Sequence, residues 1–443
     1  MIPLELSNIL EQAHLNATKP SPIVYNLSGL FVLPDGYVEI IGIERLTGMG
    51  NYVTARTDDL RVRVRIQPGL YQSKILPYKD DLQFELITST DEGTYLQYYR
   101  CVPLSVSDTE SLGNTTKELD LSIYDSQNFI SLDFQLFDLG FSKLRTIPYS
   151  QTFLSARVGD VIHNVYSEET RRLGLQGQDE FRGVFIEEPI DNQVVYRQIS
   201  IPQGETLMIN VPQWLQEKDY GVYTRGIGSY YAQGEWRVYT LWDTTKYERS
   251  DFTLDIVRVP EDVMPSIEES YFVNKTNVTI ISNGRAELYN SVDVKVQNQG
   301  AGQQIISSKV ANGMVGSHYN NGQVILSRKD SLTQYRTVER KSGEERVNVN
   351  PVPTNNIARE ISKSRVNNGE VLVLPWKNAD HALIRPGMGF RYYYLTADNV
   401  LKMRTGTVIG KAFDYAPTQA ASIYTFYCNV NLTLFMGLEE YDA

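Results

Sequence analysis

Cysteine is almost absent from this sequence of 443 residues. Only Cys101 and Cys428 occur, which excludes a small scaffold held together by several disulfides. Two cysteines in so long a chain are typical of free thiols in a protein that folds in a reducing cytoplasm, although a single bridge between them is compatible with the count.

Long hydrophobic runs and an excess of basic charge are missing too. No stretch approaches 18 uninterrupted apolar residues, so we expect no membrane-spanning helix. The first twenty residues lack the basic start and apolar run of a secretion signal. With 42 Lys and Arg against 53 Asp and Glu, the formal net charge is −11. This balance argues against non-specific wrapping of nucleic acid and against adhesion to an anionic membrane, because both need a basic surface.

Sequence motifs for catalysis and metal binding are lacking as well. There is no HExxH, GxSxG or paired CxxC motif, and the four histidines, His14, His163, His318 and His381, stand alone. The segment Gly406–Lys411, GTVIGK, resembles a phosphate-binding loop, but it is one residue short between its glycines and is followed by Ala412. We therefore predict no catalytic, cofactor-binding or metal-binding residues and no cofactor. One enzyme class stays open, since a glycan hydrolase needs only two carboxylates about 5 to 10 Å apart.

Tyrosine is abundant, with 29 Tyr against 15 Phe and 4 Trp. Tyrosine suits strands in general, and it also suits surfaces that become buried against a partner. The composition alone leaves both interpretations open.

Alternation with a two-residue period dominates the first 145 residues. In residues 61–66, RVRVRI, three arginines share one face and three apolar residues share the other: Arg61, Arg63 and Arg65 against Val62, Val64 and Ile66. Three interpretations of such a stripe are open: it lines a channel, it meets an acidic partner, or it forms the solvent-exposed face of an antiparallel sheet. Further strands are expected at residues 37–43, 82–88, 95–102 and 129–137, with a polar loop at 105–120. We predict an antiparallel sheet or barrel, with a first domain over residues 1–140.

The pattern changes to helical spacing near residue 150. The apolar residues Leu154, Val158, Val161, Ile162 and Val165 predict a helix over 152–166, capped by Ser150 or Thr152. A second helix is expected to start at Asn210, with Pro212 in its first turn, and to carry Trp214, Leu215, Val222 and Ile227. A strand over Glu235–Asp243 completes a predicted α+β unit over residues 141–250.

Strands return in the last 190 residues. They are expected at 252–258, 277–282, 286–296 and 369–374, with loops at 297–322 and 341–356 and a short helix over 356–366 that carries Ile357 and Ile361. The clearest strand is 424–436. Its apolar face contains Tyr424, Phe426, Cys428, Val430, Leu432, Leu434 and Met436, and its polar face contains Asn429, Asn431 and Thr433.

Several segments, in this order, resemble the baseplate hub protein of contractile-tailed bacteriophages. They are ISLDFQLFDLGFSKLRTIPYSQTF (130–153), SARVGDVIHNVY (155–166), residues 212–243, IAREISKSRVNNGEVLVLPW (357–376), LIRPGMGFRYYY (383–394) and the final strand IYTFYCNVNLTLFM. None is a catalytic signature, and the similarity lies in their order over more than 300 residues. Distal tail and tube-initiator proteins share the tube domain and fit the two sheet regions nearly as well.

The resemblance implies a mainly β fold with α+β insertions. It comprises two β-barrel-like tube domains, at 1–140 and at 251–300 with 381–443, plus accessory domains at 141–250 and 301–380. The implied function is that of a non-enzymatic, homotrimeric tail hub that links the six-fold tail tube to the three-fold central spike and forms part of the DNA-ejection channel.

The partners that the resemblance implies are copies of the chain itself, the tail tube, central spike and baseplate wedge proteins, and, as a further candidate, the tape-measure protein. DNA would pass through the lumen without sequence-specific binding. The implied location is the virion tail baseplate, with assembly in the cytoplasm of the host bacterium. Two other hypotheses remain: a tail-associated hydrolase of cell-wall glycan and a receptor-binding module.

Overall fold

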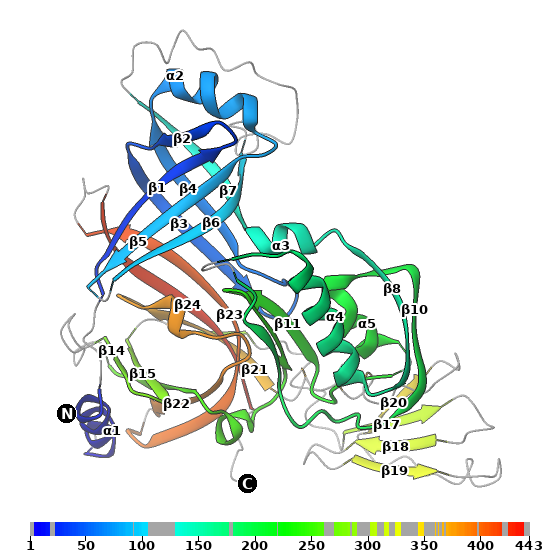
Figure 1. The fold of residues 1–443 in the computed structure, drawn as a ribbon. Helices are drawn as coiled ribbons and strands as arrows, with labels where there is room; N and C mark the ends of the chain where they lie inside the picture. The colour runs from blue at the N-terminus through cyan, green and yellow to red at the C-terminus, as the bar shows by residue number, and fades with distance from the viewer. Residues whose placement is uncertain are drawn as a thin grey trace.

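The computed structural model is mainly β, as expected, and the helices α3, α4 and α5 lie together in one unit (Figure 1). It describes residues 4–17, 23–91, 93–104, 129–176, 180–218, 220–260, 270–283, 286–289, 369–396, 398–418 and 424–437, the four strands between 302 and 349, and the single positions 359, 362 and 366.

Eight strands close a first barrel. They are β1 (Tyr25–Leu33), β3 (Gly42–Asn51), β4 (Asp59–Ile66), β5 (Gln83–Thr90), β6 (Gly93–Pro103), β7 (Ile130–Asp138) and parts of β23 (Leu401–Pro417) and β24 (Thr425–Gly437). The order is β23-β3-β4-β7-β6-β5-β1-β24, and β24 pairs again with β23, so the ladder returns to its start. Every pairing in this ring is antiparallel. The short strand β2 (Gly36–Glu39) forms a hairpin with β1 outside the ring.

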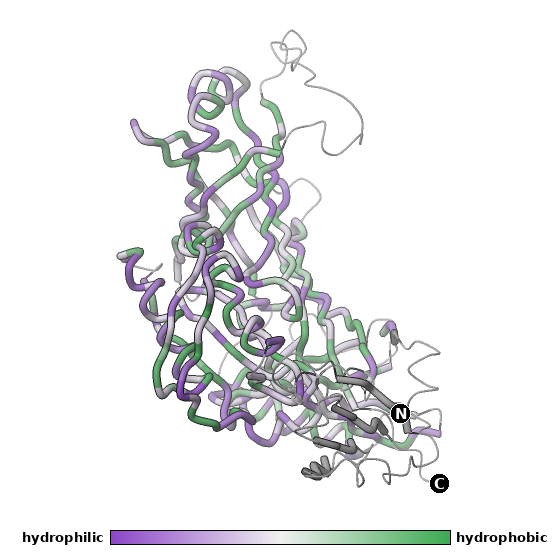
Figure 2. Tube along the Cα trace, turned by 90° about the vertical axis from the view of Figure 1, so that its right-hand side faces the viewer, coloured by the Kyte–Doolittle hydropathy of each residue, from purple (hydrophilic) through white to green (hydrophobic). Residues whose placement is uncertain are grey.

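The walls of this barrel follow the alternation in the sequence. Val62, Val64 and Ile66 of β4 are at most 1% exposed, whereas the arginines between them face outward. Figure 2 shows hydrophobic and hydrophilic residues alternating along these strands. A helical segment consisting of α2 (Pro68–Leu70), η1 (Tyr71–Ile75) and η2 (Leu76–Tyr78) lies at one end of the barrel (Figure 1). Because the inward residues fill the interior, this barrel is a packed core and has no open pore of its own.

A second, barrel-like sheet continues from the same two strands. Its order is β14 (Tyr271–Val273), β15 (Asn277–Ser282), β13 (Thr253–Arg258), β22 (Gly389–Leu395), β23, β24, β21 (Gly369–Trp376) and β16 (Glu287–Tyr289). Strand β13 runs parallel to both β15 and β22. Between β15 and β21 there is no ladder, but the Ser282 hydroxyl donates to the carbonyl of Pro375 at 2.9 Å. The sheet therefore curls almost to closure.

The long hairpin β23–β24 belongs to both sheets. Residues 401–407 of β23 pair with β22, whereas residues 410–415 pair with β3 of the first barrel. The change of partner coincides with a bulge at Ile409, whose carbonyl accepts from the Tyr52 amide at 3.0 Å. On β24, Thr425 and Phe426 pair with β1, and the later residues pair with β21. One continuous core consequently runs through both sheets.

Helix α1 (Leu4–Leu15) covers the outer face of the second sheet. Leu6 is fully buried there against Val257, Val259, Phe272 and Ile281. The inner face of the same strands faces the shared core. Strands β13, β15 and β22 are thus covered on both sides, as is usual for parallel strands.

The α+β accessory unit has its own core. It contains α3 (Leu139–Leu144), β8 (Pro148–Ala156), α4 (Val158–Arg172), β9 (Gly183–Ile186), β10 (Tyr196–Leu207), η6 (Met208–Asn210), α5 (Val211–Glu217), β11 (Ile227–Ala232) and β12 (Glu235–Thr240). Strands β8 and β10 form a two-stranded ribbon, and β11, β12 and β9 form a small sheet. At the centre of the core, the rings of Tyr166 and Trp236 stack with 4.0 Å between centroids.

A separate four-stranded sheet has the order β19 (Val324–Arg328), β18 (Met314–His318), β17 (Gly302–Ser307) and β20 (Glu344–Val349). The loops that we predicted at 297–322 and 341–356 are therefore wrong in part, since β17, β18 and β20 fall within them. Polar and glycine-rich composition misled the prediction, because two-residue alternation is weak in these strands.

Other boundaries also need correction. Residues 152–156 form the end of strand β8, and the helix α4 begins only at Val158 with Arg157 as N-cap, so Leu154 is 73% exposed and Ser150 and Thr152 cap nothing. Helix α5 starts after Asn210 as predicted but stops at Glu217, before Val222 and Ile227.

The predicted strand at 37–43 is two strands, broken at residues 40 and 41, and the one at 235–243 ends at Thr240. Tyr424 precedes β24 and is 58% exposed, so it does not belong to the apolar face. The loop at 105–120, residues 290–296, Ile357 and Ile361 lie outside the described residues.

Sequence boundaries of the four domains remain predictions. The structure adds one fact about them: β21, which lies within the segment expected to form the inserted domain 301–380, pairs along its whole length with β24.

Candidate functional site: the charge network between the accessory unit and the barrels

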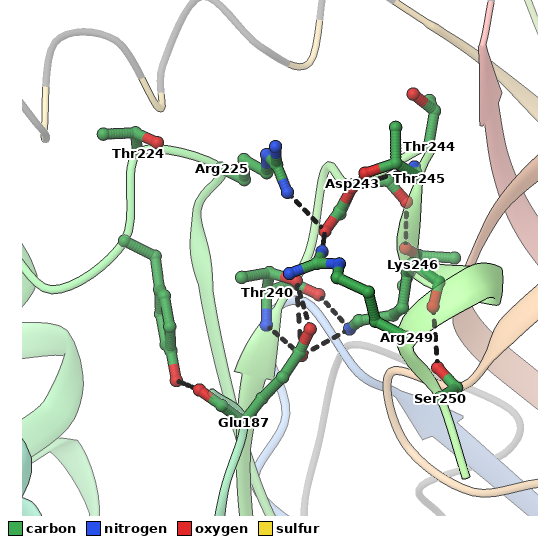
Figure 3. A network of polar contacts seen from close by, with 12 residues as sticks. Glu187, Thr224, Arg225, Thr240, Asp243, Thr244, Thr245, Lys246, Arg249 and Ser250 are labelled. Atoms are coloured by element: carbon green, nitrogen blue, oxygen red, sulfur yellow. Dashed lines mark hydrogen bonds and ion pairs between the residues drawn. The ribbon is translucent and has the colours of Figure 1, made fainter. Parts of the chain in front are cut away.

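The connection from β12 to β13 contains a cluster of buried charges (Figure 3). Asp243 is 1% exposed and lies directly after the small sheet of the accessory unit. One oxygen of its carboxylate accepts from the Arg225 guanidinium at 2.8 Å and also bonds Arg249. The other accepts from the amide and the hydroxyl of Thr245, both at 2.9 Å. This carboxylate ties Arg225, which precedes β11, to Thr245 and Arg249 of the connection.

A second buried pair lies beside the first. The Lys246 ammonium is 2.7 Å from a carboxylate oxygen of Glu187 and 2.7 Å from the carbonyl oxygen of Thr240. Glu187 in turn accepts from the amide of Thr240 at 2.9 Å and from its hydroxyl at 3.1 Å. Since Glu187 directly follows β9 and Lys246 begins η7 (Lys246–Arg249), the pair fastens the connection to the edge of the small sheet.

The ionisation of these groups follows from burial and pairing. Burial by itself would raise the pKa of Asp243, but Arg225, the Thr245 amide and Arg249 hold this pKa below its usual value. Burial lowers the pKa of Lys246, and Glu187 offsets only part of that effect. Both groups gain partners for their charged forms, which is the requirement for burying charge without a large penalty.

The same connection is hydrogen-bonded to the barrels. The hydroxyl of Thr407, on β23, donates to the carbonyl of Asp243 at 2.6 Å, and Thr405 donates to the carbonyl of Thr244 at 2.6 Å. Two tyrosines of the accessory unit bond the first barrel. The Tyr239 hydroxyl donates to the carbonyl of Tyr52 at 2.8 Å, and the Tyr230 hydroxyl donates to Asp58 at 2.7 Å. The network therefore fixes the accessory unit against both sheets.

Chemically, the charged groups of this network are engaged with one another and position segments of the chain. Each carboxylate oxygen of Asp243 and Glu187 already has a donor, and Lys246 has a carboxylate and a carbonyl. Sequence reasoning missed these residues, because charged side chains scattered over a turn give no periodic signal.

The arginine stripe predicted from RVRVRI is real, but its charges have partners within the chain. Arg65 bonds Glu44, and Arg63 lies 3.4 Å from Asp133 and 3.8 Å from Glu44. Arg61 is 3.8 Å from Asp59. These acids come from β3, β7 and β4 itself, so the face is a lattice of alternating charges on the outside of the first barrel.

Thirteen of the tyrosines in the described part of the chain are buried inside it. Seven of them are less than 2% exposed: Tyr52, Tyr166, Tyr223, Tyr230, Tyr231, Tyr239 and Tyr271. The rings of Tyr52 and Tyr230 meet edge to face with 4.9 Å between centroids, across the junction between the first barrel and the accessory unit. These tyrosines are therefore buried against other parts of the same chain.

The four histidines lie apart. His14 and His163 are exposed on α1 and α4, and His318 is in β18. The ring of His381 stacks on Phe413 with 4.0 Å between centroids, and its Nε2 is 2.9 Å from the Tyr415 hydroxyl. Across the described residues, no three His, Cys, Asp or Glu side chains lie together in a way that could hold a metal ion.

Two other sequence features also have structural positions. Cys101 and Cys428 are buried free thiols on β6 and β24. GTVIGK lies inside β23 with no following helix, which agrees with our rejection of a phosphate loop. None of the helices in the described part of the chain combines the length and hydrophobicity that a membrane crossing requires.

Comparisons with known proteins give distant structural similarities only. No protein-family model and no curated protein sequence matches the chain. Among solved structures, a tail protein from Neisseria meningitidis MC58 aligns with a TM-score of 0.48 and 12% identity, over 93% of this chain and 96% of that one. The 43 kDa tail protein of prophage MuSo2 from Shewanella oneidensis aligns with a TM-score of 0.48 and 10% identity, over 92% and 98%.

A third similarity is to the E. coli c3393 protein, described as a component of the type VI secretion system with structural similarity to T4 bacteriophage tail proteins gp27 and gp5. It has a TM-score of 0.40 and 10% identity, over 90% of this chain and 74% of that chain. Similarities at this level are too distant to assign the chain to a family.

Proposed function

We propose that this chain is a structural subunit of a phage tail baseplate, which assembles as a homotrimeric hub. The observation that supports the proposal is the shared hairpin β23–β24, through which a single chain presents two barrel-like sheets held at one fixed distance. Three such chains around an axis place six sheets in a ring. That geometry matches a six-fold tube on one side and a three-fold spike on the other.

The rigidity of the subunit fits this role. The buried pairs Asp243–Arg225 and Glu187–Lys246, with the Thr405 and Thr407 hydroxyls, fix the accessory unit against the sheets. A hub that transmits load between tube and spike needs this type of junction. In the proposed assembly the chain catalyses no reaction and needs no cofactor.

The proposed partners are a second and third copy of the chain, the tail tube protein, the central spike protein, the baseplate wedge proteins and the tape-measure protein. Passing DNA would traverse the lumen without sequence-specific contacts. The proposed location is the virion tail, after assembly in the cytoplasm of the host.

Mass measurement tests the ring directly. Three chains of 50.4 kDa make a particle of about 151 kDa, which light scattering after size exclusion resolves from the single chain. We expect the larger mass at micromolar concentration and a ring with a central hole in negative stain. A monodisperse 50 kDa species, both alone and mixed with the spike protein, would refute the trimer.

A further inference from the structure

Among the residues that the structure describes, the ribbon β8/β10 of the accessory unit has a β-strand edge without a partner. In this part of the chain, strand β8 pairs only with β10, and β10 only with β8. In Figure 1 the ribbon lies at the periphery of the accessory unit, with α4 and α5 on its inner side. An isolated two-stranded ribbon gains little stability from its own hydrogen bonds, so its outer edge is suited to receive a third strand.

The two edges of the ribbon differ in protection. Strand β10 contains Pro202, and its register shifts between Ile201 and Thr206, two features that natural proteins use to block edge pairing. Strand β8 has neither over residues 149–154, YSQTFL, because Pro148 precedes this stretch and Ser155, with a φ of 50°, follows it. It also has no charged residue in that stretch. The unprotected edge is therefore that of β8.

The surface of β8 is open to a partner. Ser150, Gln151, Thr152 and Ser155 are exposed, and Leu154 is 73% exposed, an unusual value for a large apolar side chain on a strand. The inward residues Tyr149 and Phe153 pack on the accessory core, which holds the strand in place without using its outer edge. Among the described residues, no backbone hydrogen bond reaches 149–156 from any strand other than β10.

Basic side chains surround this uncharged edge. Lys143 and Arg145 precede β8, Arg157 follows it, and Arg197 lies on β10, all four exposed. Within the described part of the chain none of the four forms an ion pair, and the Arg145 guanidinium lies over the ring of Phe137 at 4.7 Å from its centroid. Glu168 and Glu169 act on Tyr149 at the start of the strand, where Arg172 opposes them, so the four cations without an ion pair in the described part of the chain flank the stretch that follows.

We propose that β8 is a docking edge for an extended, acidic polypeptide segment of another protein. The segment adds a third strand to the ribbon through main-chain hydrogen bonds, which supply most of the affinity. An uncharged centre of the segment lies over Thr152 and Leu154, and acidic residues at its ends meet Arg145 and Arg157. Charge complementarity selects the occupant, and the proposal does not depend on the ring described above.

Designed peptides test the proposal on the full-length protein. The probe is a fluorescein-labelled DETVTVTVTED, with KKTVTVTVTKK as the charge-reversed control and an acidic peptide with alternate N-methylated amides as the hydrogen-bonding control. We expect the acidic probe to bind about tenfold more tightly than the basic one, from several exposed charge contacts, and N-methylation to abolish binding. Hydrogen exchange of residues 149–156 should slow on binding. The exchange rates of the β10 amides should stay as they are in the free protein, because their hydrogen bonds to β8 already exist.

Substitution of the basic rim gives the second arm. Arg145→Glu with Arg157→Glu should reverse the preference between the two probes, whereas Lys79→Glu with Lys377→Glu, which lie after η2 and after β21 and away from β8, should leave it unchanged. Because all four positions are exposed, folding is checked by an unaltered melting temperature.

Three results would overturn the proposal. The first is equal affinity for both probes. The second is equally tight binding of an oligothymidine of the same charge, which would indicate a nucleic-acid surface. The third is slow hydrogen exchange of residues 149–156 in the unliganded protein, with a rate that falls further as the protein concentration rises. This result would mean that a second copy of the chain already occupies the edge.

Discussion

Leu432 on β24 gives the sharpest test of the shared hairpin. Its side chain is fully buried, and it pairs with Leu374 of β21 on one side and Lys411 of β23 on the other. Leu432→Ala removes three carbons, one methine and two methyls, from a core that serves both sheets. Large-to-small substitutions of this type cost about 2–5 kcal/mol, the higher values where the surroundings cannot collapse into the cavity. Because β24 is held by strands on both sides, we expect about 3–4 kcal/mol.

Asn431→Ala is the matched control. Asn431 is the neighbouring residue on the same strand, is exposed, and pairs with Pro375 and Ala412. Its replacement should change the free energy of unfolding by no more than about 0.5 kcal/mol. Urea unfolding followed by tryptophan fluorescence measures both variants, and hydrogen exchange reports which strands open.

The location of the loss is as informative as its size. If the hairpin couples the two sheets, Leu432→Ala should accelerate exchange in β3 and β4 of the first barrel as well as in β21 and β22 of the second. Equal midpoints for the two variants would show that the register of β24 is shifted by one residue. Faster exchange in β21 and β22 alone would show that the sheets open independently and would refute the coupling.

Three further outcomes are expected. Asp243→Ala should lower the free energy of urea unfolding by about 2–3 kcal/mol, because Arg225 and Arg249 lose their common anion. As a control, Asp251→Ala on the nearby exposed turn should lower it by under about 0.5 kcal/mol. Similar losses for the two variants would argue against a stabilising role of the Asp243 network. Burial and the neighbouring Lys411 hold the pKa of His381 well below its usual value. Its neutral form therefore contributes fully to the free energy of unfolding above about pH 6.5. As the pH falls below that value, this contribution decreases by up to about 1.4 kcal/mol per pH unit. The unfolding midpoint of His381→Gln should therefore vary less between pH 7 and pH 5 than that of the unsubstituted protein, and parallel curves would contradict the assignment. Burial raises the pKa of both Cys101 and Cys428, so iodoacetamide should leave the native protein unmodified. After denaturation without reductant, mass spectrometry should show two labelled thiols. An intact bridge between the two residues would contradict the free, buried thiols.

Regular alternation made the barrel strands predictable. The stripe of β4 and the apolar face of β24 from Phe426 to Met436 follow directly from a two-residue period, and both are confirmed. The start of α5 after Asn210 was equally visible, because Pro212 fits only the first turn of a helix.

Long-range pairing left no such trace. Nothing in the local pattern shows that β23 changes partner at Ile409, since a bulge adds one residue without altering composition. The helix expected over 152–166 was placed too early, because Leu154 happens to continue the helical spacing of Val158 and Ile162 while lying on a strand. The network of Asp243, Glu187 and Lys246 joins residues up to 59 positions apart, and only the fold brings them together.

Helix α1 makes the two sheets of one chain unequal on their outer surfaces. The second sheet has its outer face covered by Leu6 and its neighbours, whereas the corresponding surface of the first barrel is an open lattice of arginines and carboxylates. In a ring of three chains, covered and bare positions would alternate around the circumference. A protein that wraps the outside of such a ring would then find three equivalent docking places and not six. Symmetry would already be reduced at the level of the subunit, before any spike protein is bound.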